Sequence, residues 1–349
     1  EFHSLAAEHG MDLRDLLGDW LYETGLPGFL ISDVETLRLK DTTTGQPQYQ
    51  TTLHVRNGER TPGMFAIEYM WGFSRREEDV TQDKTQPIRL KGNEAVEIGI
   101  VSGSPLWDAK FHPYLALNRG VVSLLGRDHF AQYKKLGVDN FKNVVTEPFN
   151  GVRPSAWHPD QDVSPGTLVV DDLDNTFQFH SSNEVPSYDS PFVPFRVDTD
   201  QGIPAYQVFM DAPSWWARNS ELQDAIGRYR KTIAMKGAGD GDSWVAFNTE
   251  IPKTGRWRLE YHLPQRFNKW RKWQWGTYDI QLAVDNSTHH IEFDSGAAPS
   301  GWNSLGDFDL SAGNVQLRVS DKSSGSIVIA DAIRWRPLDK DEVYTAKAD

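Results

Sequence analysis

The strongest constraint on the fold is a series of short segments in which apolar and polar residues alternate. The pattern runs through residues 49–55, 65–71 and 96–100, and turn sequences such as Asn57-Gly58 separate the segments. Alternation with a period of two is typical of strands that bury one face, and Asn-Gly is a favoured tight turn. Residues 31–150 are therefore predicted to form an antiparallel, immunoglobulin-like β-sandwich.

The same alternation continues through the second half of the chain. The segments that show it are AIGRYRKTIAMK, DSWVAFNTEI, GRWRLEYHLP, GTYDIQLAVDN, THHIEFDS, GNVQLRVSD and SIVIADAIRWRP. They predict a second, larger, jelly-roll-like sandwich over residues 166–338. The glycine-rich sequence from Gly237 to Asp242 precedes one of these strands, so we predict a hairpin turn there and not a phosphate-binding loop.

Three further regions flank the two sandwiches. Residues 151–165 hold prolines and little periodicity, which predicts a linker, and residues 339–349 form a polar tail. Residues 1–30 are predicted to be a helical pair, because an apolar stripe recurs there at helical spacing. The stripe consists of Leu13, Leu16, Leu17, Trp20 and Leu21. It needs an apolar partner, which either the sandwiches or a domain outside this sequence supplies.

The charge balance and the missing residue types exclude several classes of function. Lys and Arg total 36 against 49 Asp and Glu, and the net charge of −13 opposes nucleic-acid binding. The absence of cysteine excludes disulfides, thiolate metal sites and cysteine nucleophiles. No apolar run reaches the roughly 20 residues that span a bilayer. The N-terminus lacks the apolar core of a signal peptide, so we expect the chain to begin partway into a longer protein.

Three groups of motifs resemble known families. Residues 12–29, DLRDLLGDWLYETGLPGF, are similar to the helix that closes the catalytic domain of gluzincin aminopeptidases, the zinc enzymes typified by aminopeptidase N. Residues 112–120 and 147–157, HPYLALNRG and EPFNGVRPSAW, look like the tail of aminopeptidase-like proteins fused to bacterial ABC-type permeases. The motifs VVDDLDNTF, GRWRLEYHLP, GWNSLGDFDL and SIVIADAIRWRP resemble a golvesin C-terminal-like domain, which is itself similar to a xanthan lyase domain assigned to carbohydrate binding.

These resemblances imply a non-catalytic C-terminal region of an exported, membrane-associated zinc-peptidase-like protein. Such peptidases bind zinc through H-E-x-x-H, and none of the ten histidines begins that motif. Zinc is therefore expected only in a catalytic domain outside this chain, and the chain itself is expected to hold no catalytic residue, cofactor or metal ligand. The expected partners are that catalytic domain and its membrane segments. The expected location is extracytoplasmic.

The densest group of candidate binding residues lies in PQRFNKWRKWQWGTY. It interleaves aromatic rings with cations: Arg266, Phe267, Lys269, Trp270, Arg271, Lys272, Trp273 and Trp275. Aromatic faces suit sugar rings, and cations attract acidic polysaccharide or anionic lipid headgroups. The alternative is a loop whose tryptophans pack on the sandwich while its charges stay in water. The sequence leaves both interpretations open.

Histidine and carboxylate groups offer weaker candidates. His290 and Glu292 share one face of a predicted strand and His289 points to the other, and two ligands do not make a zinc site. Asp331, within the apolar strand IVIADAI, is predicted to be a buried hydrogen-bond centre. Further carboxylates leave calcium open as an alternative to turn capping, although their spacing is not that of an EF-hand; they are Asp171, Asp172, Asp174, Asp198 and Asp200.

Three functional hypotheses follow. The first is an accessory or binding region that supports a peptidase-like catalytic domain and holds it to an envelope or polysaccharide surface. The second is a free-standing carbohydrate-binding protein, based on the golvesin-like motifs and the tryptophan-rich segment. The third is a polysaccharide lyase or hydrolase, which no recognisable catalytic motif supports.

Overall fold

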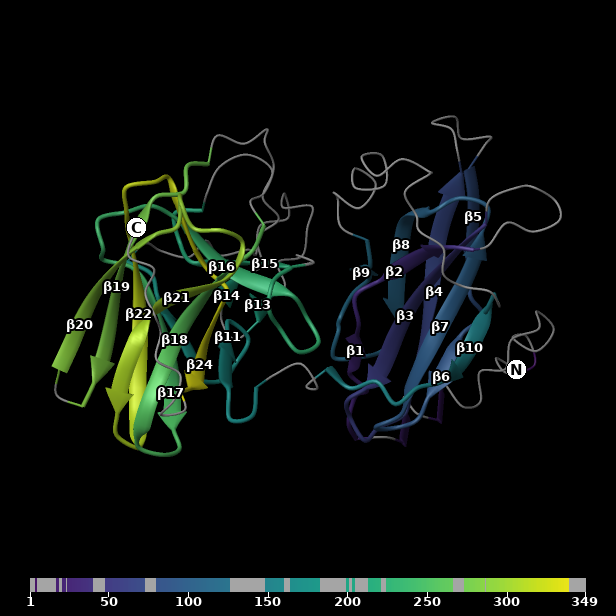
Figure 1. Ribbon diagram of the computed structural model, residues 1–349, viewed down its shortest axis with the longest axis horizontal. Coiled ribbons are helices and arrows are strands. Elements are labelled where there is room, and N and C mark those ends of the chain that lie inside the picture. The colour runs from purple at the N-terminus through teal and green to yellow at the C-terminus, as the bar shows by residue number, and fades with distance from the viewer. Residues whose placement is uncertain are drawn as a thin grey trace. The chain divides into compact units, whose positions relative to one another are not determined.

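The chain is mainly β and divides into two compact units (Figure 1). The computed structural model describes residues 4, 17–18, 21–22, 24–39, 48–72, 80–125, 148–159, 164–182, 199–200, 203–204, 213–220, 224–265, 273–285 and 287–338. The N-terminal unit covers residues 1–162 and the C-terminal unit residues 163–349. The mainly β class with sandwiches is confirmed. Among the described residues, no helix is both long and apolar enough to cross a membrane.

The described part of the N-terminal unit forms two antiparallel sheets. The first has the order β1 (Phe29–Ile31), β3 (Tyr49–Asn57), β7 (Ala95–Ser102) and β10 (Gly151–Pro154), with β2 (Glu35–Arg38) also beside β3. The second has the order β5 (Val80–Lys84), β4 (Gly63–Gly72), β8 (Leu106–Pro113) and β9 (Val122–Ser123), with β6 (Ile88–Leu90) also beside β4. One cluster of apolar side chains draws on both sheets, which makes the unit a sandwich.

Three phenylalanines and one asparagine tie these two sheets together. The rings of Phe29, Phe65 and Phe111 contact one another, with centroids 4.9 to 5.5 Å apart. The buried Asn118 amide accepts a hydrogen bond from the Phe29 N–H and donates one to its carbonyl, both at 2.9 Å. The side chain thus takes the place of a neighbouring strand at the edge, where unpaired backbone groups would otherwise be buried.

Two regions differ from the sequence interpretation or lie mostly outside the described residues. Gly151–Pro154, assigned above to a linker, is strand β10 and pairs with β7. Four residues with one proline are too few for alternation to be visible, and Pro154 is tolerated because it ends an edge strand. Of the predicted N-terminal helices, Ser4, Leu17–Gly18 and Leu21–Tyr22 are helical, and most of the rest lies outside the described residues.

Among the described residues, the C-terminal unit contains four sheets, of which two form its main sandwich. The four-stranded sheet has the order β11 (Leu168–Asp171), β24 (Ala332–Pro337), β18 (Gly255–Leu263) and β21 (Gly301–Leu310). The five-stranded sheet has the order β12 (Phe177–His180), β17 (Trp244–Ile251), β22 (Gly313–Ser323), β19 (Thr277–Val284) and β20 (Ser287–Asp294). The smaller sheets are β15 (Ala217–Ser220), β16 (Thr232–Gly237) and β23 (Ile327–Ala330), and the pair β13 (Thr199–Asp200) and β14 (Ile203–Pro204).

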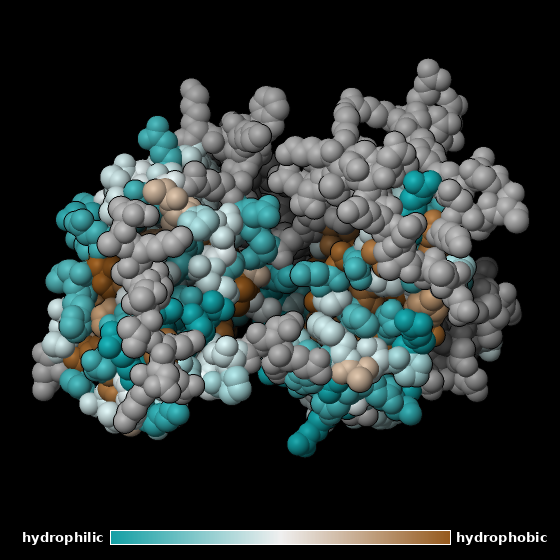
Figure 2. Space-filling view, in the orientation of Figure 1, coloured by the Kyte–Doolittle hydropathy of each residue, from teal (hydrophilic) through white to brown (hydrophobic). Residues whose placement is uncertain are grey.

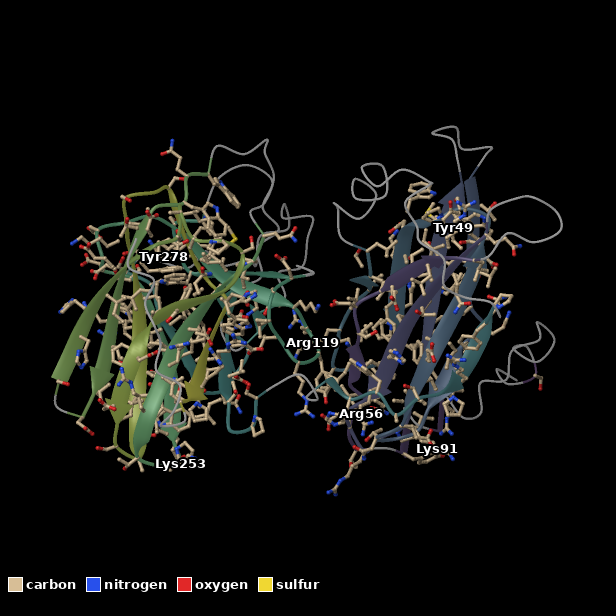
Figure 3. The ribbon with its side chains drawn as sticks, viewed as in Figure 1. Tyr49, Arg56, Lys91, Arg119, Lys253 and Tyr278 are labelled. Carbon is tan, nitrogen blue, oxygen red and sulfur yellow. The ribbon has the colours of Figure 1, made fainter. Side chains whose placement is uncertain are left out.

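The core between the two large sheets is rich in aromatic side chains, and Tyr278 lies among them (Figure 3). The Tyr261 hydroxyl donates to the Ile329 carbonyl at 2.6 Å, and the Ile329 N–H donates to the Tyr278 hydroxyl at 3.3 Å. Buried phenols need such partners, because an unpaired hydroxyl in an apolar core is costly. Both tyrosines therefore fix β23 against the sandwich.

The glycine-rich loop at 237–242 differs from its prediction. It connects β16 to β17, which belong to different sheets, so the predicted hairpin is wrong. The loop is built around Asp321, whose Oδ1 accepts from the Gly241 N–H at 2.8 Å and whose Oδ2 lies 2.5 Å from the Lys236 Nζ. Both ends of that ion pair are buried. A long-range partner, not local turn chemistry, thus sets the shape of the loop.

Candidate functional site on the five-stranded sheet

The five-stranded sheet of the C-terminal unit buries one face and leaves the other polar. Alternation along β17 and β22 sends Phe247 and Leu317 inward and leaves Trp244 and Arg318 on the outer face. We call this outer face the polar face. Its residues are Gln178, His180, Trp244, Ala246, Asn248, Glu250, Thr277, Asp279, Gln281, Ala283, Thr288, His290, Glu292, Asp294, Asn314, Gln316, Arg318 and Ser320. It holds no aliphatic side chain larger than alanine.

The centre of the polar face is a row of three stacked side chains from neighbouring strands. Arg318 lies on β22, the middle strand, and its guanidinium carbon is 4.1 Å from the centroid of the Trp244 ring on β17. His180, on the far side of β17, stacks on the same indole with centroids 5.5 Å apart and planes at 28°. The strand order brings these residues together from three distant parts of the chain.

The hydrogen-bonding groups around this row are largely unused. Within the described part of the chain, Arg318 forms no hydrogen bond or ion pair, and its Nε is buried without a partner. The amide of Gln316 donates to the Asn248 Oδ1 at 2.8 Å, whereas the Gln281 amide makes no hydrogen bond to a described residue. The Trp244 indole N–H likewise has no partner among the described residues. Donors and acceptors therefore face a ligand or solvent.

On the outer face of the four-stranded sheet, three arginines pair with carboxylates. Arg258 forms a bidentate ion pair with the Asp307 carboxylate: its Nε donates to Oδ1 at 2.7 Å and its Nη2 donates to Oδ2 at 3.0 Å. Arg334 and Arg336 share one oxygen of Glu260, at 2.6 and 2.7 Å. Each of these cations has a carboxylate partner on its own face. Arg318 differs because, within the described part of the chain, its guanidinium contacts the Trp244 ring and no carboxylate.

A second group of titratable side chains is buried near the junction of β23 and β24. Asp331, fully buried between these strands, accepts from the Ile226 N–H at 3.0 Å, and its Oδ2 lies 2.6 Å from the His262 Nδ1. Burial raises the pKa of Asp331 well above its usual range and lowers the pKa of His262 to about 4. The buried hydrogen-bond centre predicted at Asp331 is confirmed.

The VVDDLD segment supplies two turn-capping carboxylates and one buried ion pair. Asp171 accepts from the Leu173 N–H and Asp174 from the Asp171 N–H, at 2.8 and 2.9 Å, which confirms turn capping for both. Asp172 is instead fully buried and paired with Arg218. Asp198 lies outside the described residues, as does the Asp200 side chain. No cluster of three or more His, Asp or Glu side chains suited to a metal occurs in the part of the chain that the structure describes.

Most of the tryptophan-rich segment lies outside the described residues, including Arg266, Phe267, Lys269, Trp270, Arg271 and Lys272. Trp273 and Trp275 are described: both are partly buried and pack against an apolar cluster that includes Ile233 and Ile327. The segment stays a candidate. His290 faces outward on β20, whereas His289 contacts the Phe308 ring on the other side, so the predicted orientation of the histidines is confirmed.

The polar face was not identified from the sequence, although the alternation of two strands already indicated which of their residues point outward. Alternation in DSWVAFNTEI and GNVQLRVSD puts Trp244 and Arg318 on the polar side of their strands. What the sequence lacks is the strand order, since His180 and Arg318 are far apart along the chain. Only the pairing of β12, β17 and β22 makes them neighbours.

Comparison with known proteins adds a domain assignment. No curated protein matches the chain. Among solved structures, Paenibacillus xanthan lyase is 12% identical with a TM-score of 0.35; the match covers 91% of this chain and 26% of that one. A CBM35 from Cellvibrio japonicus Abf62 is 13% identical with a TM-score of 0.27, over 50% of this chain and 94% of that one. A family 35 carbohydrate binding module from Clostridium thermocellum is 16% identical with a TM-score of 0.21. The match covers 35% of this chain and 99% of that one.

The chain thus spans only 26% of the xanthan lyase chain to which it is similar. The family match is confined to the C-terminal unit and includes β17, β19 and β22 of the polar face. Residues 203–336 are similar to the Golvesin C-terminal domain.

Proposed function

We propose that this chain is a non-catalytic binding region whose C-terminal unit holds a polysaccharide on the polar face. The observation that carries the proposal is the row of His180, Trp244 and Arg318, beside which the Gln281 amide has no hydrogen-bond partner among the described residues. Sugars present hydroxyl groups that both donate and accept hydrogen bonds, and amide side chains do the same. An aromatic ring adds apolar contact with the carbon-bound hydrogens of a sugar.

Two competing ligand classes fit the polar face poorly. Nucleic acid is opposed because its phosphate backbone is bound by several cations, whereas the residues of the polar face given above include a single arginine and no lysine. A protein partner held by apolar contact needs a continuous hydrophobic patch. The coloured surface of the C-terminal unit is largely hydrophilic in the space-filling view (Figure 2), and the polar face offers only Trp244 and alanines as apolar groups.

The proposal is tested by affinity electrophoresis of the full chain through gels that contain single polysaccharides. At least one polymer should retard the chain, and Trp244→Ala should weaken that retardation roughly tenfold. Trp107→Ala is the matched control, because Trp107 is a 37% exposed tryptophan of the N-terminal unit. If no polymer retards the chain, or if Trp244→Ala migrates like the parent, the proposal fails. Release of reducing ends or unsaturated products would overturn its non-catalytic part.

We also propose that the chain serves an extracytoplasmic, aminopeptidase-like protein and helps to hold it on an envelope surface. The support, beyond the resemblance of residues 12–29, is an exposed apolar face: Leu21 and Tyr22 are helical and 70% and 83% exposed. Such side chains on one helix suit a further domain packed against it.

This second proposal is tested on the native protein. An antibody against the chain should capture, from a membrane or extracellular fraction, a species that contains zinc and an H-E-x-x-H peptide. Capture of a zinc-free species of 39.6 kDa from the cytoplasm would overturn it.

A further inference from the structure

The polar face contains a cation that the protein itself does not neutralise. Arg318 has a buried Nε without a partner, and no carboxylate contacts its guanidinium within the described part of the chain. Desolvating a guanidinium is costly unless an anion compensates for it. Three partly buried arginines on the opposite sheet follow that rule, since Asp307 pairs with Arg258 and Glu260 pairs with Arg334 and Arg336. A partly buried guanidinium without a carboxylate partner, on the middle strand of the sheet, is well placed to bind an anionic group of a ligand.

The surroundings of Arg318 fit a single carboxylate. The cross-strand row through Arg318 is otherwise uncharged apart from a histidine at its end; it consists of Gln178, Ala246, Arg318, Gln281 and His290. The adjoining row carries the carboxylates of Asp279 and Glu292, and Lys322 lies four positions further along β22. A single guanidinium can donate two parallel hydrogen bonds to a carboxylate, and with no second cation beside it the site matches a group with one negative charge. A phosphate dianion would call for more positive charge.

The cross-strand row from Gln178 to His290 also has the length of an oligosaccharide-binding site. Five strands at about 4.8 Å spacing give a row roughly 19 Å long. Small Ala246 lies next to Arg318 in the row, and Trp244 borders it on the adjacent one. Because Ala246 is fully buried, a sugar ring would lie beside the partly exposed Trp244, with the Arg318 fork at one edge and the Gln281 amide within reach of the next ring.

We propose that the ligand of the polar face is an acidic polysaccharide that contains hexuronic acid, with one uronate carboxylate bound by the Arg318 guanidinium. This inference rests on the proposed polysaccharide-binding function and narrows it to one chemical class. The Trp244 ring keeps the fork in place by stacking on it, and the flanking amides bind hydroxyl groups of the neighbouring sugars.

The test compares two pairs of polymers, and the members of each pair share a sugar backbone but differ in charge. The full chain is titrated with polygalacturonate and with the same polymer after methyl esterification, alongside neutral dextran and dextran sulfate. Polygalacturonate should bind, its affinity should fall with added salt, and esterification should remove the binding. Arg318→Gln should weaken polygalacturonate binding on the order of tenfold to a hundredfold, because a charge-assisted pair of hydrogen bonds is lost. Arg318→Lys should restore part of it.

Arg256→Gln is the matched control, because Arg256 is an exposed arginine on the outer face of the other sheet. It should bind polygalacturonate like the parent, and circular dichroism melting should show that every variant is folded. Binding of dextran that needs Trp244 but ignores esterification and Arg318→Gln would refute the uronate inference while leaving the proposed function intact. Preference for dextran sulfate over polygalacturonate would also refute it. Failure of every polymer would remove both proposals.

Discussion

The Nε of Arg218 lies 2.6 Å from the Oδ2 of Asp172, and the two side chains are 1% and 0% exposed. The Arg218 Nη2 also contacts the Asp172 carbonyl, and the Thr232 hydroxyl donates to the other carboxylate oxygen at 2.7 Å. This ion pair joins the β11–β12 connection to β15 and β16, so a fully buried charge pair fixes two sheets to each other. We predict that Arg218→Met costs about 3–5 kcal/mol of unfolding free energy, because it leaves the carboxylate buried and unpaired.

The measurement is urea denaturation followed by tryptophan fluorescence. Arg258→Met is the control, since the Arg258–Asp307 pair is partly exposed, with side chains 15% and 18% accessible, and is expected to contribute only about 1 kcal/mol. A loss for Arg218→Met no larger than that of the control would show that the buried pair is not a major source of stability.

Gly239 has no room for a side chain. A Cβ at this position would lie 2.3 Å from the Asp321 Oδ2, which is held by Lys236, while the Gly241 N–H holds Oδ1. The carboxylate is fixed through both oxygens and cannot rotate away. We expect Gly239→Ala to cost about 1–3 kcal/mol in chemical denaturation, as overpacking does.

Two comparisons separate this clash from a general effect of removing glycine. Gly103→Ala should be close to neutral or slightly stabilising, because a Cβ there meets nothing within 4 Å. In an Asp321→Ala background, the penalty of Gly239→Ala should shrink, which a double-mutant cycle measures directly. An unchanged penalty in that background would contradict the assigned cause.

Asp171 should make stability depend on pH. Burial, together with the charges of Asp172 and Asp174, raises the pKa of Asp171 from 3.8 to about 8. The folded chain therefore holds this proton more tightly than the unfolded chain. The stabilisation is complete below about pH 4 and is lost as the pH rises through about 8. Asp171→Asn cannot ionise, so its unfolding free energy relative to the parent should rise by up to about 1.4 kcal/mol per pH unit between about pH 5 and 8.

Denaturation curves of both proteins at several pH values give this difference directly and cancel contributions from other groups. Asp307→Asn is the control: the hydrogen bond from Arg258 lowers the pKa of Asp307, so its contribution should be constant over that range. A flat difference for Asp171→Asn as well would mean that Asp171 is ionised at neutral pH in the folded chain.

The sequence predicted the strands well because each strand is a local pattern. Tyr49–Asn57 and Thr277–Val284 alternate so regularly that their buried faces can be assigned without a structure. Gly151–Pro154 was assigned to a linker, because four exposed residues at an edge leave no periodic signature. The hairpin predicted at 237–242 was wrong for a related reason: glycine content indicates a turn but does not say which sheets the turn connects.

Long-range pairing explains what the sequence could not supply about the site. The tryptophan-rich segment drew attention because its aromatic and basic residues are adjacent in sequence, yet Trp273 and Trp275 pack partly buried against Ile233 and its neighbours. His180, Trp244 and Arg318, by contrast, lie far apart in the sequence. Their row becomes visible only once β17 is known to lie between β12 and β22. Antiparallel sheets routinely build surfaces in this way, since cross-strand neighbours are set by register.

The ionised Glu260 should stabilise the outer face of the four-stranded sheet, because two arginines pair with its carboxylate. Burial alone would raise the pKa of Glu260, but hydrogen bonds from Arg334 and Arg336 outweigh it and lower that pKa. The stabilisation is therefore present above the ordinary glutamate pKa and is lost as the pH falls below it. Glu260→Gln should cost about 1–3 kcal/mol at pH 7, because two partly buried guanidinium groups lose the carboxylate charge that they share. The difference between the urea curves of variant and parent should shrink as the pH falls below the ordinary glutamate pKa, whereas Glu250→Gln, at an exposed position, should match the parent throughout. A Glu260→Gln penalty that stays unchanged as the pH is lowered would mean that side-chain packing, not the charge of the carboxylate, is what Glu260 contributes.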